Sequence, residues 1–129
     1  LCGGCSLKDV SGLGKLPLWI IHGTADRAVP VKQSKVVVDK LKRGGNDSRL
    51  IYDWWQGANH GMPARVFYMK KTYQWLFSHT LNDPDRPVNR DIDISMGDVR
   101  NAYDGVNRNA PKPELIDGPS VIKDEGNEY

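Results

Sequence analysis

The chain has 129 residues, of which 39% are hydrophobic and 26% charged, as in an ordinary globular domain. It contains no run of about 18 apolar residues, so we expect no membrane span. Residues 1–80 carry 12 Lys and Arg against 5 Asp and Glu, and residues 81–129 carry 6 against 11. Because the basic residues of 32–43 fall on the exposed side of an expected helix, we expect no nucleic-acid partner.

The chain opens without Met and carries two cysteines, Cys2 and Cys5, in a C-x-x-C pair. Such a pair can form a disulfide, a redox centre or half of a zinc site. No second C-x-x-C and no H-x-x-x-H motif completes a zinc set. We therefore favour a loop of small residues at the exit of a strand, and keep a redox or metal protein as an alternative.

The first expected strand covers residues 16–22, a nearly continuous apolar run that is typical of a strand covered on both faces by helices. Pro17 suits its first position. The loop His22-Gly23-Thr24-Ala25-Asp26 follows directly. The Asp26 side chain is therefore expected to lie just past the C-terminal end of this strand.

A helix is expected next, opening at Val29-Pro30-Val31, since Pro is favoured at the first helical position. Ser34, Val37, Val38 and Leu41 share the i, i+3, i+4, i+7 spacing of one buried stripe. Gly44-Gly45 ends the helix, because a C-terminal turn favours a residue with positive φ.

Residues 49–55 form the second expected strand, and a glycine-bounded loop, residues 56–61, follows it and carries His60. After Pro63, helical spacing predicts a second amphipathic helix over residues 64–79. Its expected buried face consists of Val66, Met69, Tyr73, Leu76 and Phe77. The order strand, helix, strand, helix predicts two parallel neighbouring strands with helices packed on the sheet.

Two strands are too few for a stable, doubly covered parallel sheet. We therefore expect that the chain is the C-terminal portion of a larger protein whose other strands lie upstream, or that another copy of the chain completes the sheet. Residues 1–80 are expected to belong to the domain. Residues 81–129 are expected to form an acidic, largely irregular extension whose first half is anchored by apolar side chains. The anchoring candidates are Ile92, Ile94, Val99 and Tyr103.

Asp26 and His60 are the candidate catalytic residues. If the two strands are parallel and adjacent, both side chains emerge at the same edge of the sheet, where a carboxylate can orient an imidazole. Together they are two thirds of a nucleophilic triad, and no serine of the chain stands in a Gly-x-Ser-x-Gly turn. Of the other histidines, His22 is expected to be packed or hydrogen-bonded near the loop, and His79 to interact with a helix end.

The segment from Pro17 to Thr80 closely resembles the C-terminal part of α/β-hydrolase enzymes. The resemblance is carried by its His-Gly-x-x-Asp-x-x-Val-Pro and Gly-x-x-His-Gly loops. The likeness is to the carboxylesterase/phospholipase, dienelactone-hydrolase-like and prolyl-oligopeptidase-type branches. It implies a partial α/β-hydrolase fold in which Asp26 is the acid and His60 the general base.

The resemblance also implies hydrolysis of an ester, thioester or peptide bond, with the nucleophile supplied by a missing upstream segment. The expected substrate is a small-molecule ester or a peptide, and no cofactor or metal is expected. A non-catalytic interaction module of the same fold is the alternative. Both a periplasmic or secreted location and a cytoplasmic one stay open.

Overall fold

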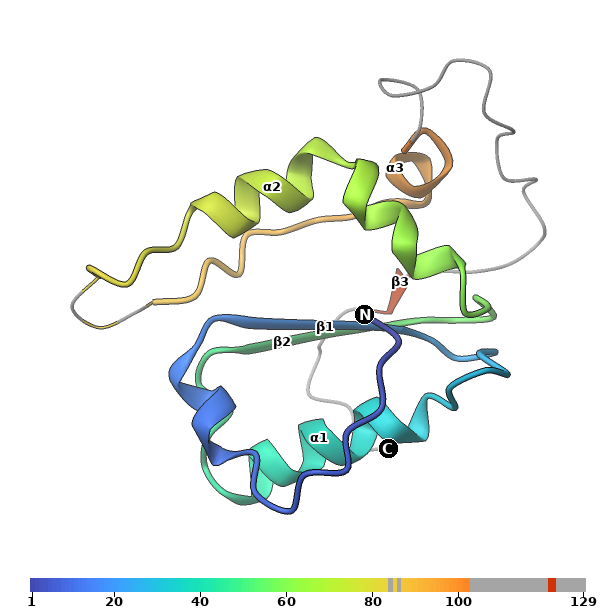
Figure 1. Ribbon diagram of the computed structural model, residues 1–129. Helices are drawn as coiled ribbons and strands as arrows, with labels where there is room; N and C mark the ends of the chain where they lie inside the picture. The colour runs from blue at the N-terminus through green and yellow to red at the C-terminus, as the bar shows by residue number, and fades with distance from the viewer. Residues whose placement is uncertain (84, 86, 103–120, 123–129) are drawn as a thin grey trace.

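The computed structural model describes residues 1–83, 85, 87–102 and 121–122 (Figure 1). Within these ranges no helix is both long and apolar enough to cross a bilayer. In chain order the elements are η1 (Ser11–Lys15), β1 (Leu18–Gly23), α1 (Lys32–Arg43), β2 (Leu50–Trp55), η2 (Met62–Tyr68), α2 (Lys70–Phe77), α3 (Met96–Arg100) and β3 (Val121–Ile122).

The centre of the fold is a sheet in which β1 and β2 are parallel neighbours, as the sequence predicts. The register pairs Leu18 with Leu50 at one end and Gly23 with Trp55 at the other. The short β3 adds an antiparallel pairing on the far side of β2, so the strand order is β1-β2-β3. Every residue of β2 is buried. The two strands therefore end side by side at their carboxyl ends.

Helices cover both faces of this sheet (Figure 1), which explains why β1 and β2 are apolar without alternation. One face packs against α1, in a cluster that includes Val38, Leu41 and Tyr52. The opposite face packs against η2 and α3, in a second cluster that includes Ile21 and Trp55. The fold is a partial α/β-hydrolase fold.

Helix α1 confirms the predicted stripe, because its buried residues are Ser34, Val37, Val38 and Leu41. The helix begins at Lys32, a little after the predicted opening, and Gly45 has the positive φ of +67° that the Gly-Gly pair predicts. This packing holds the segment after Asp26 against the sheet.

The prediction of a single helix over residues 64–79 is wrong, because the structure has two helices in this segment. Met69 has extended backbone angles, φ −107° and ψ 129°, and divides the segment into the 3-10 helix η2 and the α-helix α2. This break changes the phase of the helical repeat. Val66 and Met69 are buried as predicted, but the buried side chain of α2 is Trp75. Tyr73, Leu76 and Phe77, expected in the core, are 43%, 52% and 79% exposed.

The segment before residue 103 returns to the domain. Ile94 and Val99 are buried in the cluster that contains Ile21, while Ile92 is partly buried beside it. A capping box in which Ser95 and Asp98 exchange hydrogen bonds starts the short helix α3. Tyr103 lies outside the described residues, and the division of the chain at residue 80 stays a prediction.

Candidate active site

Asp26 lies in the tight loop that follows β1, and its carboxylate is held by the loop's own backbone. Oδ1 accepts hydrogen bonds from the backbone N–H groups of Ala28, at 2.9 Å, and Val29, at 2.8 Å. The side chain is fully buried. Because a short acidic side chain can accept from backbone groups two and three residues ahead, the local sequence already favours this turn.

The loop that carries His60 is hydrogen-bonded to the loop of Asp26. The backbone N–H of Ala25 donates to the carbonyl of Ala58, and the backbone N–H of Gly57 donates to Oγ1 of Thr24, at 3.0 and 2.8 Å. Gly57 has a positive φ of +73°, which favours glycine at this turn. These contacts place the two loops against each other at the carboxyl ends of β1 and β2.

Asp26 and His60, predicted to meet at one edge of the sheet, are in direct contact. Nδ1 of His60 lies 2.7 Å from Oδ2 of Asp26. An ionised carboxylate only accepts hydrogen bonds, so Nδ1 carries the proton and Nε2 of the neutral ring keeps its lone pair. This is the tautomer that a general base of a triad requires.

The electrostatics of Asp26 favour its charged form. Burial opposes ionisation, but the hydrogen bonds from the Val29 backbone, the His60 side chain and the Ala28 backbone outweigh it, and the pKa of Asp26 is lowered to about 2. The carboxylate therefore stays ionised at neutral pH. An ionised neighbour stabilises the imidazolium that forms when His60 accepts a proton.

The His60 side chain is 51% exposed, in contrast to the buried Asp26. Among the described residues, the hydrogen bond of the His60 ring is the one from Nδ1 to Asp26, and none involves Nε2. Two cavities, of about 290 and 380 Å³, lie along α2, and neither is lined by Asp26 or His60. The His60 imidazole is thus accessible to solvent, whereas the Asp26 carboxylate is not.

His22 is a contact of Asp26 that the sequence analysis did not identify. Its ring is fully buried at the end of β1, and its Nε2 lies 3.1 Å from Oδ2 of Asp26. The expectation that His22 is hydrogen-bonded near the loop is confirmed, since Nε2 also lies 2.8 Å from the Val29 carbonyl and Nδ1 2.7 Å from Oγ of Ser34. The i, i+4 spacing of His22 and Asp26 around a turn was the available signal.

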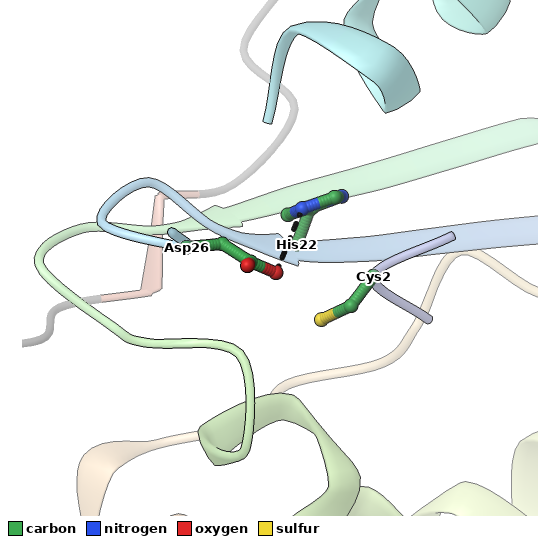
Figure 2. A group of neighbouring side chains, drawn as sticks. All are labelled: Cys2, His22 and Asp26. Carbon is green, nitrogen blue, oxygen red and sulfur yellow. Dashed lines mark ion pairs between the residues drawn. The ribbon is translucent and has the colours of Figure 1, made fainter. Parts of the chain in front are cut away.

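Cys2, His22 and Asp26 form a buried group whose ligand atoms lie within 4.8 Å of one another (Figure 2). Zinc accepts thiolate, imidazole and carboxylate ligands, but both nitrogens of His22 and Oδ2 of Asp26 already have protein partners. Burial, followed by the charge of Asp26, raises the pKa of the Cys2 thiol against the lowering effect of a Gly23 backbone hydrogen bond. The neutral thiol is therefore favoured while no cation is bound.

The C-x-x-C pair does not act as one unit in the structure. Both cysteines are free, and only Cys2 belongs to the group around Asp26. His79, by contrast, lies where it was expected, at the end of α2, with Nδ1 2.8 Å from the carbonyl of Trp75. Its Nε2 accepts from the backbone of Asn89 at 2.8 Å, so both ring nitrogens are engaged.

Comparison with known proteins gives one family match. The model of the prolyl oligopeptidase family matches residues 7–83, which include β1, β2 and both loops of the site. No curated protein and no solved structure gives a significant match to the chain.

Proposed function

This chain belongs to the prolyl oligopeptidase family, and on that premise we propose that Asp26 and His60 are the acid and the general base of a Ser–Asp–His triad. The observation that carries the proposal is the 2.7 Å hydrogen bond between Nδ1 of His60 and Oδ2 of Asp26. The buried carboxylate and the exposed imidazole have the burial that their two roles need.

In the proposed reaction, Nε2 of His60 removes the proton of a serine hydroxyl while the serine oxygen attacks the substrate carbonyl carbon. The imidazolium, stabilised by the Asp26 carboxylate, then returns that proton to the leaving alcohol, thiol or amine. An acyl-enzyme remains. Water, deprotonated by the same nitrogen, cleaves it in a second addition, releases the acid and restores the serine hydroxyl. Asp26 keeps its charge throughout.

The nucleophile of this reaction is proposed to come from a segment upstream of these residues. None of the serines of the chain stands in a Gly-x-Ser-x-Gly turn, the setting that exposes a nucleophilic hydroxyl in this fold. On the β1 side of the sheet the N-terminal segment already lies against β1, since the backbone N–H of Cys2 donates to the carbonyl of Ile21 at 3.1 Å. Further strands beyond this edge are the natural site for the serine and the oxyanion donors.

The substrate class follows from the chemistry of the pair. A histidine–carboxylate pair and a serine act on an activated or amide carbonyl, so the proposed substrates are esters, thioesters and peptides. The two cavities along α2 are lined by neither residue of the pair, and the acyl pocket is proposed to belong to the segment that supplies the nucleophile.

The test uses the enzyme in which this chain is joined to its upstream residues. Asp26→Asn and His60→Ala are compared with the matched controls Asp39→Asn and His79→Gln, which change the same residue types away from the pair. We expect turnover of a nitrophenyl ester to fall by about 10⁴-fold for Asp26→Asn, the size of effect known for the equivalent change in a triad. The controls should retain the parent rate.

The 129-residue chain by itself is the second arm of the test. Without the nucleophile it should hydrolyse the ester no faster than free imidazole does, and a fluorophosphonate should label the longer enzyme only. Robust turnover by the isolated chain would contradict the proposed origin of the serine. Full activity of both Asp26→Asn and His60→Ala would contradict the proposed roles of the pair.

A further inference from the structure

Both ring nitrogens of His22 have partners, and these partners define its tautomer. Nε2 lies 2.8 Å from the Val29 carbonyl, which only accepts, so Nε2 carries a proton; it also lies 3.1 Å from Oδ2 of Asp26. Nδ1 lies 2.7 Å from Oγ of Ser34, which stands on the buried face of α1. The Ser34 hydroxyl also lies 3.3 Å from the carbonyl of Gly3, so it joins the His22 ring to the N-terminal segment.

The two oxygens of Asp26 are held by different parts of the fold. Oδ1 accepts hydrogen bonds from the backbone N–H groups of Ala28 and Val29 in its own loop. Oδ2 lies between two imidazoles, that of the half-exposed His60 and that of the fully buried His22. His22 belongs to β1, a rigid element, whereas His60 belongs to a loop. The buried ring of His22 therefore adds a second contact at Oδ2, which comes from a strand residue.

We propose that His22 is a positioning residue for the triad, since its ring, held by the Val29 carbonyl and by Ser34, places Nε2 3.1 Å from Oδ2 of Asp26, the oxygen that contacts His60. This inference rests on the proposed function of Asp26 and His60. His22 touches no substrate, and it acts only through the carboxylate. Outer hydrogen-bond partners of this kind make a reactive group rigid before the reaction begins.

The position of Cys2 agrees with this assignment. Its sulfur and the His22 ring both lie against Asp26 (Figure 2), and its pKa is raised by burial and by the carboxylate charge. A neutral thiol adds no second negative charge beside the Asp26 carboxylate. Cys2 and His22 therefore both contribute to the buried surroundings of Asp26, on the part of the site that is closed to solvent.

The first experiment uses the complete enzyme and compares His22→Gln, His22→Phe and Ser34→Ala. The Gln side chain keeps an N–H donor near the place of Nε2, whereas Phe keeps the ring volume without a donor. We expect kcat to fall by about 10- to 100-fold for His22→Phe, as for other outer-shell partners. KM should be unchanged, because His22 makes no substrate contact. His22→Gln should restore part of the rate, and Ser34→Ala should give an intermediate loss.

The second experiment uses the 129-residue chain and needs no activity. Proton NMR follows the Nδ1–H signal of His60, which the hydrogen bond to Asp26 shifts downfield. We expect the signal in the parent chain and in His22→Gln, and a broadened or absent signal in His22→Phe. Chemical denaturation of each variant shows whether it folds. If His22→Phe does not fold, Ser34→Ala is used in its place.

The outcomes separate this inference from the proposed function. A parent-like kcat and a parent-like His60 signal in folded His22→Phe, or in Ser34→Ala if His22→Phe does not fold, would overturn the positioning role. A loss of stability in His22→Gln equal to that in His22→Phe, without recovery of kcat, would also overturn it, because His22 would then serve packing alone. Full activity of Asp26→Asn would instead remove the proposed function itself.

Discussion

Gly23 lies directly against the backbone of Ala58. A Cβ at Gly23 would stand 2.8 Å from the carbonyl carbon of Ala58 and 2.9 Å from the carbonyl oxygen of Asn59, closer than real Cβ contacts occur. Gly23 ends β1 and Ala58 begins the approach to His60, so the missing side chain lets the loop of the base lie against the loop of the acid. The contact between Asp26 and His60 depends on this close approach.

Replacement of Gly23 should therefore affect both stability and the site. We expect Gly23→Ala to lower the free energy of unfolding by about 1–3 kcal/mol, the usual cost of overpacking. It should also lower activity of the complete enzyme by about 100-fold, since a shift of about 1 Å at a reacting group has that effect. Denaturation with urea and ester turnover measure the two effects. Gly12→Ala is the control, because a Cβ there meets nothing within 4 Å.

The free energy of unfolding at low pH should depend on the protonation of Asp26. Its pKa is about 2 in the folded chain and about 3.9 in an unfolded one, so between these values the unfolded chain binds the proton first. The stabilisation is present above about pH 4 and is lost as the pH falls through about 2. Carbon NMR of the carboxyl group gives the pKa, and a value near 3.9 would contradict the hydrogen bonding at Asp26.

The pH dependence of unfolding provides a check of the same contact. Wild-type chain and Asp26→Asn are denatured with urea at several pH values between 5 and 2. We expect the free energy of unfolding of the wild type to decrease more steeply with falling pH, because the variant has no carboxyl group to protonate at this position. Equal slopes would show that Asp26 has the same pKa in both states.

The two sides of the break at Met69 should respond differently to truncation. Met69 is 5% exposed, and we expect Met69→Ala to cost about 2–5 kcal/mol of unfolding free energy, as for buried large-to-small changes. Leu76 is 52% exposed, so Leu76→Ala should change stability by no more than about 0.5 kcal/mol. Urea denaturation distinguishes this outcome from a large loss in both variants, which a continuous helix over 64–79 with Met69 and Leu76 on one buried face predicts.

The capping box of α3 should stabilise the packing of Val99. Oγ of Ser95 accepts from the backbone N–H of Asp98 at 3.1 Å, and the Asp98 carboxylate accepts from the backbone N–H of Ser95 at 2.7 Å. We expect Ser95→Ala to lower the free energy of unfolding by about 1 kcal/mol, the typical value of a helix cap. The exposed Ser6 provides the matched Ser→Ala control, whose stability should stay within about 0.5 kcal/mol of wild type.

The sequence alone determined the sheet, helix α1 and the position of the candidate pair. Apolar runs without alternation predict doubly covered strands, and β1 and β2 are parallel neighbours. The stripe of α1 was read directly from its spacing, because one amphipathic face is a property of neighbouring residues. Asp26 and His60 follow the ends of adjacent parallel strands, so their meeting could be predicted without coordinates.

Only the tertiary structure decided the break at Met69 and the surroundings of Asp26. The phase of η2 and α2 depends on packing against a sheet face that also receives Ile94 and Val99, far along the chain. The contact of His22 with Asp26, and the approach of Cys2, likewise require the loop after β1 to fold back on the strand end. Local periodicity carries no information about such contacts, because they arise from the close packing of separate segments.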